Sequence, residues 1–497
     1  MNEFYDDWIS RKEYWFCQND ENDKYLSDKY GDLINDYCYD IQLKPILGIL
    51  IYDQLTRHYY RREYNNHILI YFNRKALEIA NKHKNQLFIN ILNINDWCFY
   101  MLVYRHSNIK ENLIFVMNEY WKLSNKNQIL KNFIKATYTR ANFEEELDYY
   151  NYPSEFDRTI LDNNPIMEIS EHQLYKIGNF DKLDTDMIII SLSGGVDSVV
   201  CLYNFHNYYK NVKIVAIHIN YNNRKEVEEE VKFLRCLCCD LDIDLYVRKI
   251  TEINRHDCMI NDLRDIYEAY TKKVRFNSYK KLQKGYENPV IILGHNKDDC
   301  FENILTNIAY NNKYENLQGI EYKSVIDGIK FIRPLIDVSK DDIYKFANDH
   351  NLPYLKNSTP NWSQRGKIRN DVIPVLEKWD NRIIDGLFNL SNILKSYNEI
   401  LNKSIENFKI SEIDNLDKLN VCELYWKYGL HKLFNIYISN KALKSLIERL
   451  ELWKNKYDKM DVNKKTIIII NKNINMIIIK RTNGVSLLNY YLKTKCQ

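Results

Sequence analysis

The chain has 497 residues, 45% of them hydrophobic and 28% charged, which is enough for two or three domains with apolar cores. Its net charge of +3 is too small to indicate a nucleic-acid binder over its whole surface, so any such site must be a local patch. Eleven cysteines without a signal peptide fit a reducing cytosol better than a disulfide scaffold and predict a cytoplasmic protein.

Helical periodicity dominates the first part of the chain. Apolar residues recur at helical spacing through 46–55, 76–80 and 88–102, and the segment from Pro45 is too short to span a bilayer. We therefore expect an all-helical domain over residues 1–175. No membrane contact is expected.

Three residue blocks in this helical part form a recognisable pattern. Tyr14-Trp15-Phe16 comes first; it is followed by Asp53-Gln54 with Arg57 and Arg61, and then by Met101 and His106-Ser107. The pattern resembles a bacterial family of uncharacterised TPR-like helical proteins. The plain interpretation is a helical scaffold, and the alternative is a second catalytic centre at His106.

A phosphate-binding turn is predicted at residues 193–198, which read SGGVDS and follow the apolar run Met187 to Leu192. Gly194 and Gly195 can take positive φ, so that backbone N–H groups close around phosphate oxygens. Ser193 and Ser198 add hydroxyl donors, and the helix that follows directs its N-terminus at the anion. Asp197 is a carboxylate among phosphates, which implies a Mg²⁺ ion between them. The alternative is an ordinary Gly-Gly turn.

The order of strand, SGGVDS and helix lacks the GK[ST] ending of a Walker A loop and resembles the PP-loop family. Members of that family use ATP to adenylate an oxygen of their substrate and release pyrophosphate. The resemblance implies an α/β fold with a parallel-sheet PP-loop core (adenine nucleotide α-hydrolase-like), with the ligand at the carboxyl ends of the strands. It implies these ATP-binding residues: Ser193, Gly194, Gly195, Val196, Asp197, Ser198, His218 and Gly294.

Later blocks narrow the resemblance. A second apolar run, Ile214 to Ile219, leads to His218, Asn220 and Arg224, and a third, Val290 to Leu293, leads to GHNKDD. Arg333-Pro334-Leu335 and RGKIRNDVIPVL follow. Over residues 185–380 these blocks resemble tRNA(Ile)-lysidine synthetases, with departures at Tyr221, Asn296 and Asn303; asparagine at the position of Asn296 also occurs in PP-loop thiolases.

That resemblance implies a two-step reaction. The O2 oxygen of a cytidine attacks the α-phosphorus of ATP, and an amine then displaces AMP at C2. A carboxylate near the amine can act as general base or positioning partner, and acids four residues apart share one helix face. The expected catalytic residues are Asp197, Arg275, His295, Asp298 and Glu302, with Asp197 and Asp298 as metal ligands. The alternative for the acids is simple capping of a helix N-terminus.

Basic and aromatic side chains alternate along one probable helix over 264–286, which could meet the phosphates and unpaired bases of an anticodon loop. A solvated helix with an aromatic core face is the competing interpretation. The residues expected to bind tRNA are Arg224, Lys272, Lys280, Lys281, Arg333, Arg365 and Arg369.

The remaining chain is predicted to form a PP-loop catalytic domain over 180–382 and a C-terminal accessory α+β domain over 383–497. In the latter, apolar runs at 466–470 and 476–479, separated by polar residues, predict a β-hairpin. The Lys-rich stretch 454–465 suits a tRNA-binding role, and a plain accessory domain is equally compatible with the sequence.

Three functions remain open. The first is an ATP- and Mg²⁺-dependent ligase that attaches free lysine to a cytidine of a tRNA anticodon. The second is another PP-loop tRNA ligase or a tRNA thiolase, and the third is a tRNA-binding scaffold without turnover. Cys236, Cys238 and Cys239 form CxCC and Cys258 stands alone, so no pair of CxxC motifs is available, and we expect neither zinc nor an iron–sulfur cluster.

Overall fold

The computed structural model describes most of the chain. The described residues are 2–11, 20–36, 44–60, 66–84, 93–124, 126–150, 177–180, 183–223, 227–309, 319–355, 364–406, 412–413, 423–434, 440–457, 466–471, 476–481 and 487–491.

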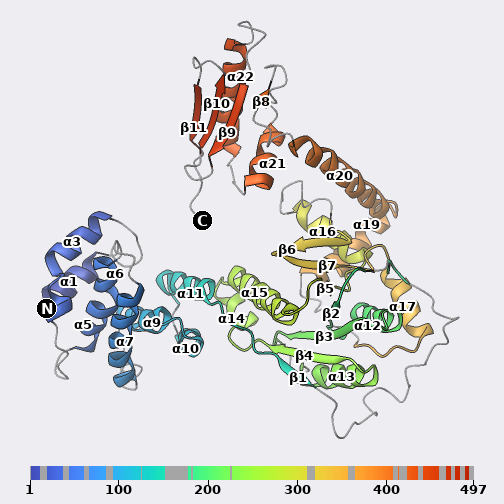
Figure 1. The fold of residues 1–497 in the computed structure, drawn as a ribbon. Coiled ribbons are helices and arrows are strands. Elements are labelled where there is room, and N and C mark those ends of the chain that lie inside the picture. Colours follow the sequence, from blue (N-terminus) through green and yellow to red (C-terminus); the bar gives the residue numbers. More distant parts are fainter. Residues whose placement is uncertain are drawn as a thin grey trace. The chain divides into compact units, whose positions relative to one another are not determined.

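Helices make up the N-terminal part up to Arg140, as the sequence predicts (Figure 1). They are α1 (Asn2–Ser10), α3 (Asp20–Tyr30), α4 (Leu33–Asp36), α5 (Pro45–Ile49), the π-helix η1 (Leu50–Leu55), α6 (Thr56–Tyr59), α7 (Asn66–Lys82), α9 (Ile94–His106), α10 (Lys110–Lys122) and α11 (Gln128–Arg140).

A seven-stranded sheet with the order β1-β4-β3-β2-β5-β7-β6 follows. Its strands are β1 (Asp148–Tyr150), β2 (Met187–Ser191), β3 (Lys213–Asn220), β4 (Asp244–Lys249), β5 (Val290–Ile292), β6 (Lys323–Ile326) and β7 (Ile329–Ile332). Pairing is parallel from β4 through β3, β2 and β5 to β7, and β1 and β6 add antiparallel edges. The α/β fold and the three apolar runs predicted as strands are thereby confirmed.

Helices cover both faces of this sheet. Alternate residues of each strand point to opposite faces, so each strand contributes side chains to two cores. Ile188 and Ile190 of β2 pack into a core with α12 (Val196–Tyr208), α13 (Val227–Asp240) and α17 (Lys340–Asp349). Ile189 belongs to a second core on the other face, together with α14 (Arg255–Ile260) and α15 (Arg264–Gln283). The sheet is therefore a central layer between helices, the arrangement that all-parallel strands require.

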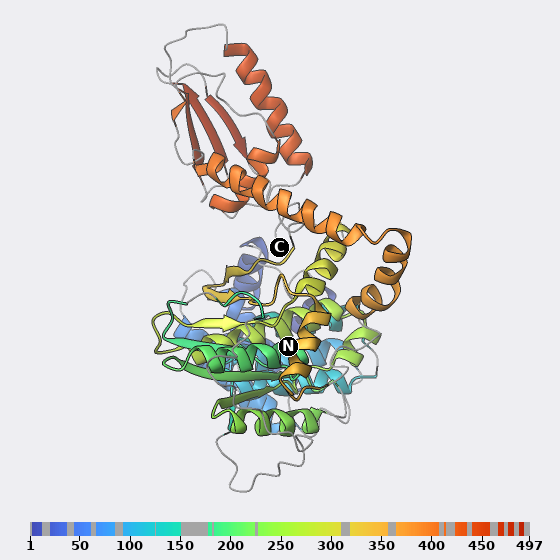
Figure 2. The same cartoon turned by 90° about the vertical axis from the view of Figure 1, so that its right-hand side faces the viewer.

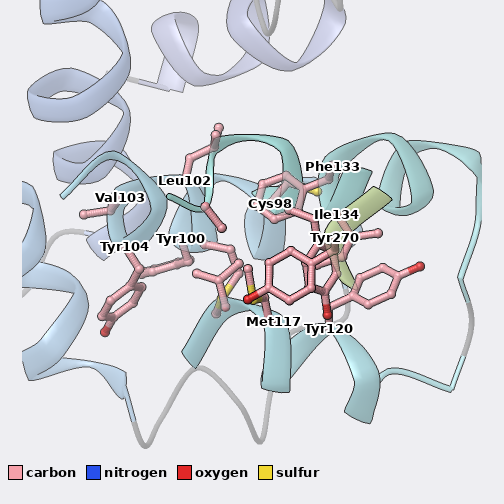
Figure 3. Close-up of a cluster of buried hydrophobic side chains, with 14 of the residues drawn as sticks. Cys98, Tyr100, Leu102, Val103, Tyr104, Met117, Tyr120, Phe133, Ile134 and Tyr270 are labelled. Carbon is pink, nitrogen blue, oxygen red and sulfur yellow. The ribbon is translucent and has the colours of Figure 1, made fainter. Parts of the chain in front are cut away.

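The N-terminal helices share that second core. Side chains of α9, α10 and α11, among them Phe133 and Tyr120, gather around Tyr270 of α15 (Figure 3). The Tyr138 hydroxyl donates to the backbone carbonyl of Glu252 at 2.7 Å, and its ring meets that of Tyr270 at a centroid distance of 4.9 Å. The helical part is thus continuous with the sheet rather than tethered to it.

Contacts divide the chain into two compact units. The first comprises 1–297 and 322–358, and the second comprises 298–321 and 359–497. The predicted division into three domains stays a prediction.

The second unit holds helices and a four-stranded antiparallel sheet, with α22 running alongside the sheet in both views (Figures 1 and 2). Its elements are most of α16 (Lys297–Ala309), α18 (Gln364–Lys367), the π-helix η6 (Ile368–Val372), α19 (Ile373–Trp379), α20 (Ile383–Glu406), β8 (Glu412–Ile413), α21 (Glu423–Phe434), α22 (Asn440–Tyr457), β9 (Thr466–Asn471), β10 (Met476–Arg481) and β11 (Leu487–Tyr491). β9 and β10 pair antiparallel, which confirms the predicted hairpin. Across the described ranges, every helix is too short or too polar to span a lipid bilayer.

Candidate functional site

The SGGVDS segment is a tight turn between β2 and α12, at the carboxyl edge of the parallel strands. The Ser198 hydroxyl donates to the carbonyl of Gly195 at 2.9 Å and accepts from the backbone N–H of Ser193 at 3.2 Å. The two serine hydroxyls lie 3.1 Å apart. These bonds close the turn at the N-terminus of a 13-residue helix, where backbone N–H groups and the helix dipole favour an anion.

Only one of the two glycines has the predicted backbone conformation. Gly194 has φ +84°, whereas Gly195 is the N-cap of α12 with φ −68° and ψ 157°, an extended conformation open to any residue. A Cβ on Gly194 would lie 2.6 Å from Leu355 Cδ1. The expectation of positive φ therefore holds for Gly194 and is wrong for Gly195.

Asp197 is held by two side chains that lie far from it in the sequence. Asn296 Nδ2 donates to Oδ1 at 2.9 Å, and Lys340 Nζ lies 2.5 Å from Oδ2. Lys340 takes this position because Ser339 caps α17, its hydroxyl accepting from the backbone N–H of Asp342. The Asp197 side chain is 20% exposed, so the carboxylate is fixed in direction yet within reach of solvent.

Gly294 and His218 also lie near the carboxyl ends of the parallel strands. A Cβ on Gly294 would approach the backbone carbon of Asp197 and the amide nitrogen of Ser198 to 3.0 Å, so a glycine is needed where the loop after β5 meets α12. His218 of β3 is buried, and its Nδ1 lies 2.9 Å from the carbonyl oxygen of Leu192. Because a carbonyl can only accept, Nδ1 carries the proton in this contact.

The acids after β5 belong to α16, as predicted. Glu302 is fully buried and forms an ion pair with Arg369 of η6, with its Oε1 2.7 Å from Nη2 and 2.9 Å from Nε. Asp299 lies 3.7 Å from the same guanidinium. Burial lowers the pKa of Arg369, but the charges of Glu302 and Asp299 outweigh it and raise that pKa. Arg369, expected to bind tRNA, thus has carboxylate partners within its own unit.

His295 lies in the loop between β5 and α16 and is partly buried, and Asp298 is partly buried in the first turn of α16. The catalytic and metal assignments of these residues stay predictions.

The predicted helix over 264–286 is α15, and its aromatic residues form its core face. Tyr267, Tyr270, Phe276 and Tyr279 are buried, and the Tyr279 hydroxyl lies 2.8 Å from that of Ser191. These rings are therefore packed inside the first unit.

The cations of α15 divide between solvent and the N-terminal part. Lys272 and Lys280 are exposed, whereas Lys281 Nζ donates to the backbone carbonyl of Glu145. Lys273 donates to the carbonyl of Thr139 at 3.1 Å. Arg275 is partly buried, with its guanidinium carbon 5.9 Å from the ring centroid of Phe276.

Of the other residues expected to bind tRNA, Arg333 is buried and donates to the Ser324 hydroxyl at 3.0 Å. Arg224 lies outside the described residues, as does the side chain of Arg365. Lys340 stands in the sequence block that follows Arg333-Pro334-Leu335, but the sequence alone assigns it no role in the site. Its place five residues after Leu335, at the start of an Asp-rich helix, was the available signal.

We compared the chain with known protein families and with curated and solved proteins. Residues 167–376 match the family model of the PP-loop domain. These residues form a PP-loop domain.

Curated relatives match about half of the chain. The chain is 27% identical to the tRNA(Ile)-lysidine synthase of Clostridioides difficile (strain 630) over 287 residues, covering 56% of this chain and 59% of that protein. The enzyme of the same name from Staphylococcus aureus (strain MRSA252) is 29% identical over 230 residues, covering 45% and 52%. The chain thus spans about half the length of these two relatives. A solved structure, the U34-tRNA thiolase NcsA from Methanococcus maripaludis with its [4Fe-4S] cluster, is 18% identical with a TM-score of 0.34, covering 48% of this chain and 78% of that one.

Thiols and metal ligands complete the description. Seven cysteines in the described ranges are free, and Cys236 and Cys238 are buried on α13 against the sheet. Within the same ranges, no three His, Cys, Asp or Glu side chains are grouped as a metal site.

Proposed function

We propose that the chain is an ATP-dependent ligase that adenylates a cytidine of a tRNA anticodon and attaches free lysine to it, releasing pyrophosphate and AMP. The observation that carries this proposal is the PP-loop match over residues 167–376, together with the similarity of the chain to relatives named tRNA(Ile)-lysidine synthase. The alternative within the same domain family is a tRNA thiolase or another tRNA ligase, and the alternative outside it is a binding scaffold.

In the first step the cytidine O2 attacks the α-phosphorus of ATP and pyrophosphate leaves. The turn of Ser193, Gly194 and Ser198 offers N–H and hydroxyl donors to the phosphate oxygens, where charge accumulates in the transition state. Lys340 supports this role, because an ammonium already next to Asp197 can turn to the departing pyrophosphate.

Mg²⁺ fits the chemistry of this edge. Magnesium in nucleotide sites is commonly held by one or two carboxylates together with the phosphates, and Asp197 is a solvent-accessible carboxylate at the phosphate turn. Asp197 would hold the ion, which would neutralise phosphate charge when bound, and Asp298 is the second ligand proposed from the sequence.

In the second step the lysine amine attacks C2 of the adenylated base and AMP leaves with the former O2 oxygen. The amine must lose its proton to attack, and Glu302 is proposed to position it or accept that proton. Arg369 bears on this role because its guanidinium pairs with the Glu302 carboxylate and fixes its orientation. A cytosolic setting agrees with the free thiols, and this location is likewise a proposal.

The deciding experiment is mass spectrometry of nucleosides from tRNA incubated with the protein, ATP and isotope-labelled lysine. A lysine-bearing cytidine that requires ATP is expected. The Asp197→Ala variant should abolish pyrophosphate release and leave tRNA binding nearly unchanged. Sulfur in the product would overturn lysine transfer in favour of thiolation, and tRNA binding without any product would favour the scaffold.

A second measurement separates the two enzymatic candidates. Replacing Cys236, Cys238, Cys239 and Cys258 with Ser or Ala should spare activity in folded protein, because no sulfur carrier is needed for an amine nucleophile. Glu302→Gln should damage lysine incorporation more than adenylation in single-turnover assays. Loss of turnover in the folded cysteine variants would contradict the ligase.

A further inference from the structure

The N-terminal helices contain a polar cluster that the PP-loop chemistry does not use. Asp53 of the π-helix η1 lies at the centre of this cluster and is only 1% exposed. Its Oδ2 is 2.8 Å from His106 Nδ1, and its Oδ1 accepts from Asn73 Nδ2 at 3.0 Å and Arg57 Nη2 at 3.2 Å. Gln54 Nε2 also donates to Oδ2. Four elements, η1, α6, α7 and α9, thus converge on one buried carboxylate, and π-helices are frequent at functional sites.

Asp53 fixes the orientation of two groups that reach solvent. Burial lowers the pKa of His106 to about 4, against the opposing charge of Asp53, so the ring is neutral near pH 7 and donates from Nδ1 to the carboxylate. Its Nε2 then carries a lone pair; within the described residues this atom has no hydrogen-bond partner, and it is not among the fully buried atoms. Arg57 is 27% exposed. Among the described residues, its guanidinium donates only two long hydrogen bonds, of 3.2 and 3.4 Å, both to Asp53.

Positive charge exceeds negative charge around this cluster. Arg105, adjacent to His106 on α9, is 5% exposed and donates only a 3.4 Å bond to a backbone carbonyl of α11. In the described part of the chain its Nε has no hydrogen-bond partner. Burial, together with the charges of Arg140 and Arg57, lowers the pKa of Arg105 to about 10, against the opposing charge of Asp53. The guanidiniums of Arg57 and Arg105 therefore share the negative charge of one carboxylate, that of Asp53.

A purely structural network would have its charges balanced, because a buried charge without a counter-charge is costly. Here the surplus is positive, and the guanidinium of Arg57, 27% exposed, and the ring of His106, 9% exposed, are oriented by the same carboxylate. We propose that Asp53, Arg57 and His106 form a second ligand site, separate from the PP-loop, that binds a small oxyanion carrying a proton to share. Arg57 pairs with the anion, and His106 Nε2 accepts a hydrogen bond from its O–H group, as offered by a phosphate monoester or by a hydroxycarboxylate.

The test is peptide-resolved hydrogen–deuterium exchange of the full chain with inorganic phosphate, with lactate as a hydroxycarboxylate, and with chloride at matched ionic strength. Binding is expected to slow exchange in peptides that cover Pro45–Tyr59 and Ile94–His106. Peptides over Met187–Tyr208 report phosphate at the PP-loop separately. Protection by phosphate alone identifies a phosphate site, and protection by lactate identifies a carboxylate site. Equal effects of all three anions, or no protection at the N-terminal peptides, would overturn the proposal.

Variants connect the protection to the named groups. Arg57→Gln removes the cation, and His106→Asn keeps a donor near Nδ1 for Asp53 while removing the acceptor Nε2. Both should abolish the anion-dependent protection. Arg74→Gln is the matched control, because Arg74 is exposed on α7 next to Asn73 and should behave as the wild type. Unchanged protection in the Arg57 and His106 variants would return the cluster to a structural role.

Discussion

At the residue scale, the conformation of the predicted phosphate-binding turn depends on the positive φ of Gly194. Its positive φ costs a side-chain-bearing residue about 1–2 kcal/mol, and a Cβ would also meet Leu355. Gly194→Ala should therefore lower both the thermal unfolding midpoint and the affinity for ATP, measured by calorimetry.

A matched control separates the two causes. Gly285 has φ +90° with nothing within 4 Å of a built Cβ, so Gly285→Ala carries the backbone cost alone. It should lower the midpoint less than Gly194→Ala and leave ATP affinity unchanged. Equal loss of ATP affinity in the two variants would contradict a role for the turn.

Lys340 is the second residue whose role can be isolated. Lys340→Met removes the charge beside Asp197 and should reduce the rate of pyrophosphate release by at least tenfold, in the range lost when one electrostatic contact to a transition state is removed. Lys340→Arg should retain part of the rate, because the charge stays while the geometry changes.

Lys345→Met, on the same helix and on its exposed face, serves as the control and should behave as the wild type. If Lys340→Met releases pyrophosphate at the wild-type rate, its contact with Asp197 is only structural.

At the element scale, α15 presents two adjacent lysines in different settings. Lys280 is exposed, and Lys281 is bonded to the backbone of Glu145. If α15 meets RNA phosphates, Lys280→Ala should weaken tRNA binding and reduce the slope of log affinity against log salt by about one. Lys281→Ala should change the slope less and lower thermal stability instead. Filter binding over a salt series measures both, and identical slopes in wild type and Lys280→Ala would exclude α15 as a phosphate contact.

The sequence predicts an element well when neighbouring residues determine it, and poorly when distant residues do. β2, β3 and β5 are continuous apolar runs that lead into turns, so they are visible in the sequence. β1 reads Asp-Tyr-Tyr, a pattern without alternation or an apolar run, and is a strand only because it pairs with residues 245–247 of β4.

The same limit applies to the candidate site. The SGGVDS turn is contiguous, and its order of strand, turn and helix is visible. The pairs Asp197–Lys340 and Glu302–Arg369 join residues 143 and 67 positions apart, and nothing in their spacing brings them together. Which of the two glycines takes positive φ depends on the residue at which α12 begins. The Gly-Gly pair alone does not determine that residue.

At the scale of the whole first unit, the N-terminal helices join the apolar core that lies on one face of the seven-stranded sheet. Buried residues of α9 to α11 and of β2, β3 and α15 form one apolar core. A buried ion network reinforces it, since Arg248 of β4 lies 2.6 Å from Glu145 and 2.5 Å from Glu252.

Removing the helices would therefore expose apolar side chains of this core, among them Tyr270 of α15. Each large apolar side chain returned to water costs roughly 1.5–3 kcal/mol, and losing Glu145 leaves Arg248 with one carboxylate instead of two. We expect the fragment 177–497 to aggregate or to unfold without a cooperative transition, as followed by calorimetry and light scattering. Deletion of 407–497, which lies wholly in the second unit, should preserve the cooperative transition of the first unit. A monomeric 177–497 fragment that melts cooperatively and binds ATP would show that the helices are an appendage, and the shared core would then contribute little to the stability of the PP-loop domain.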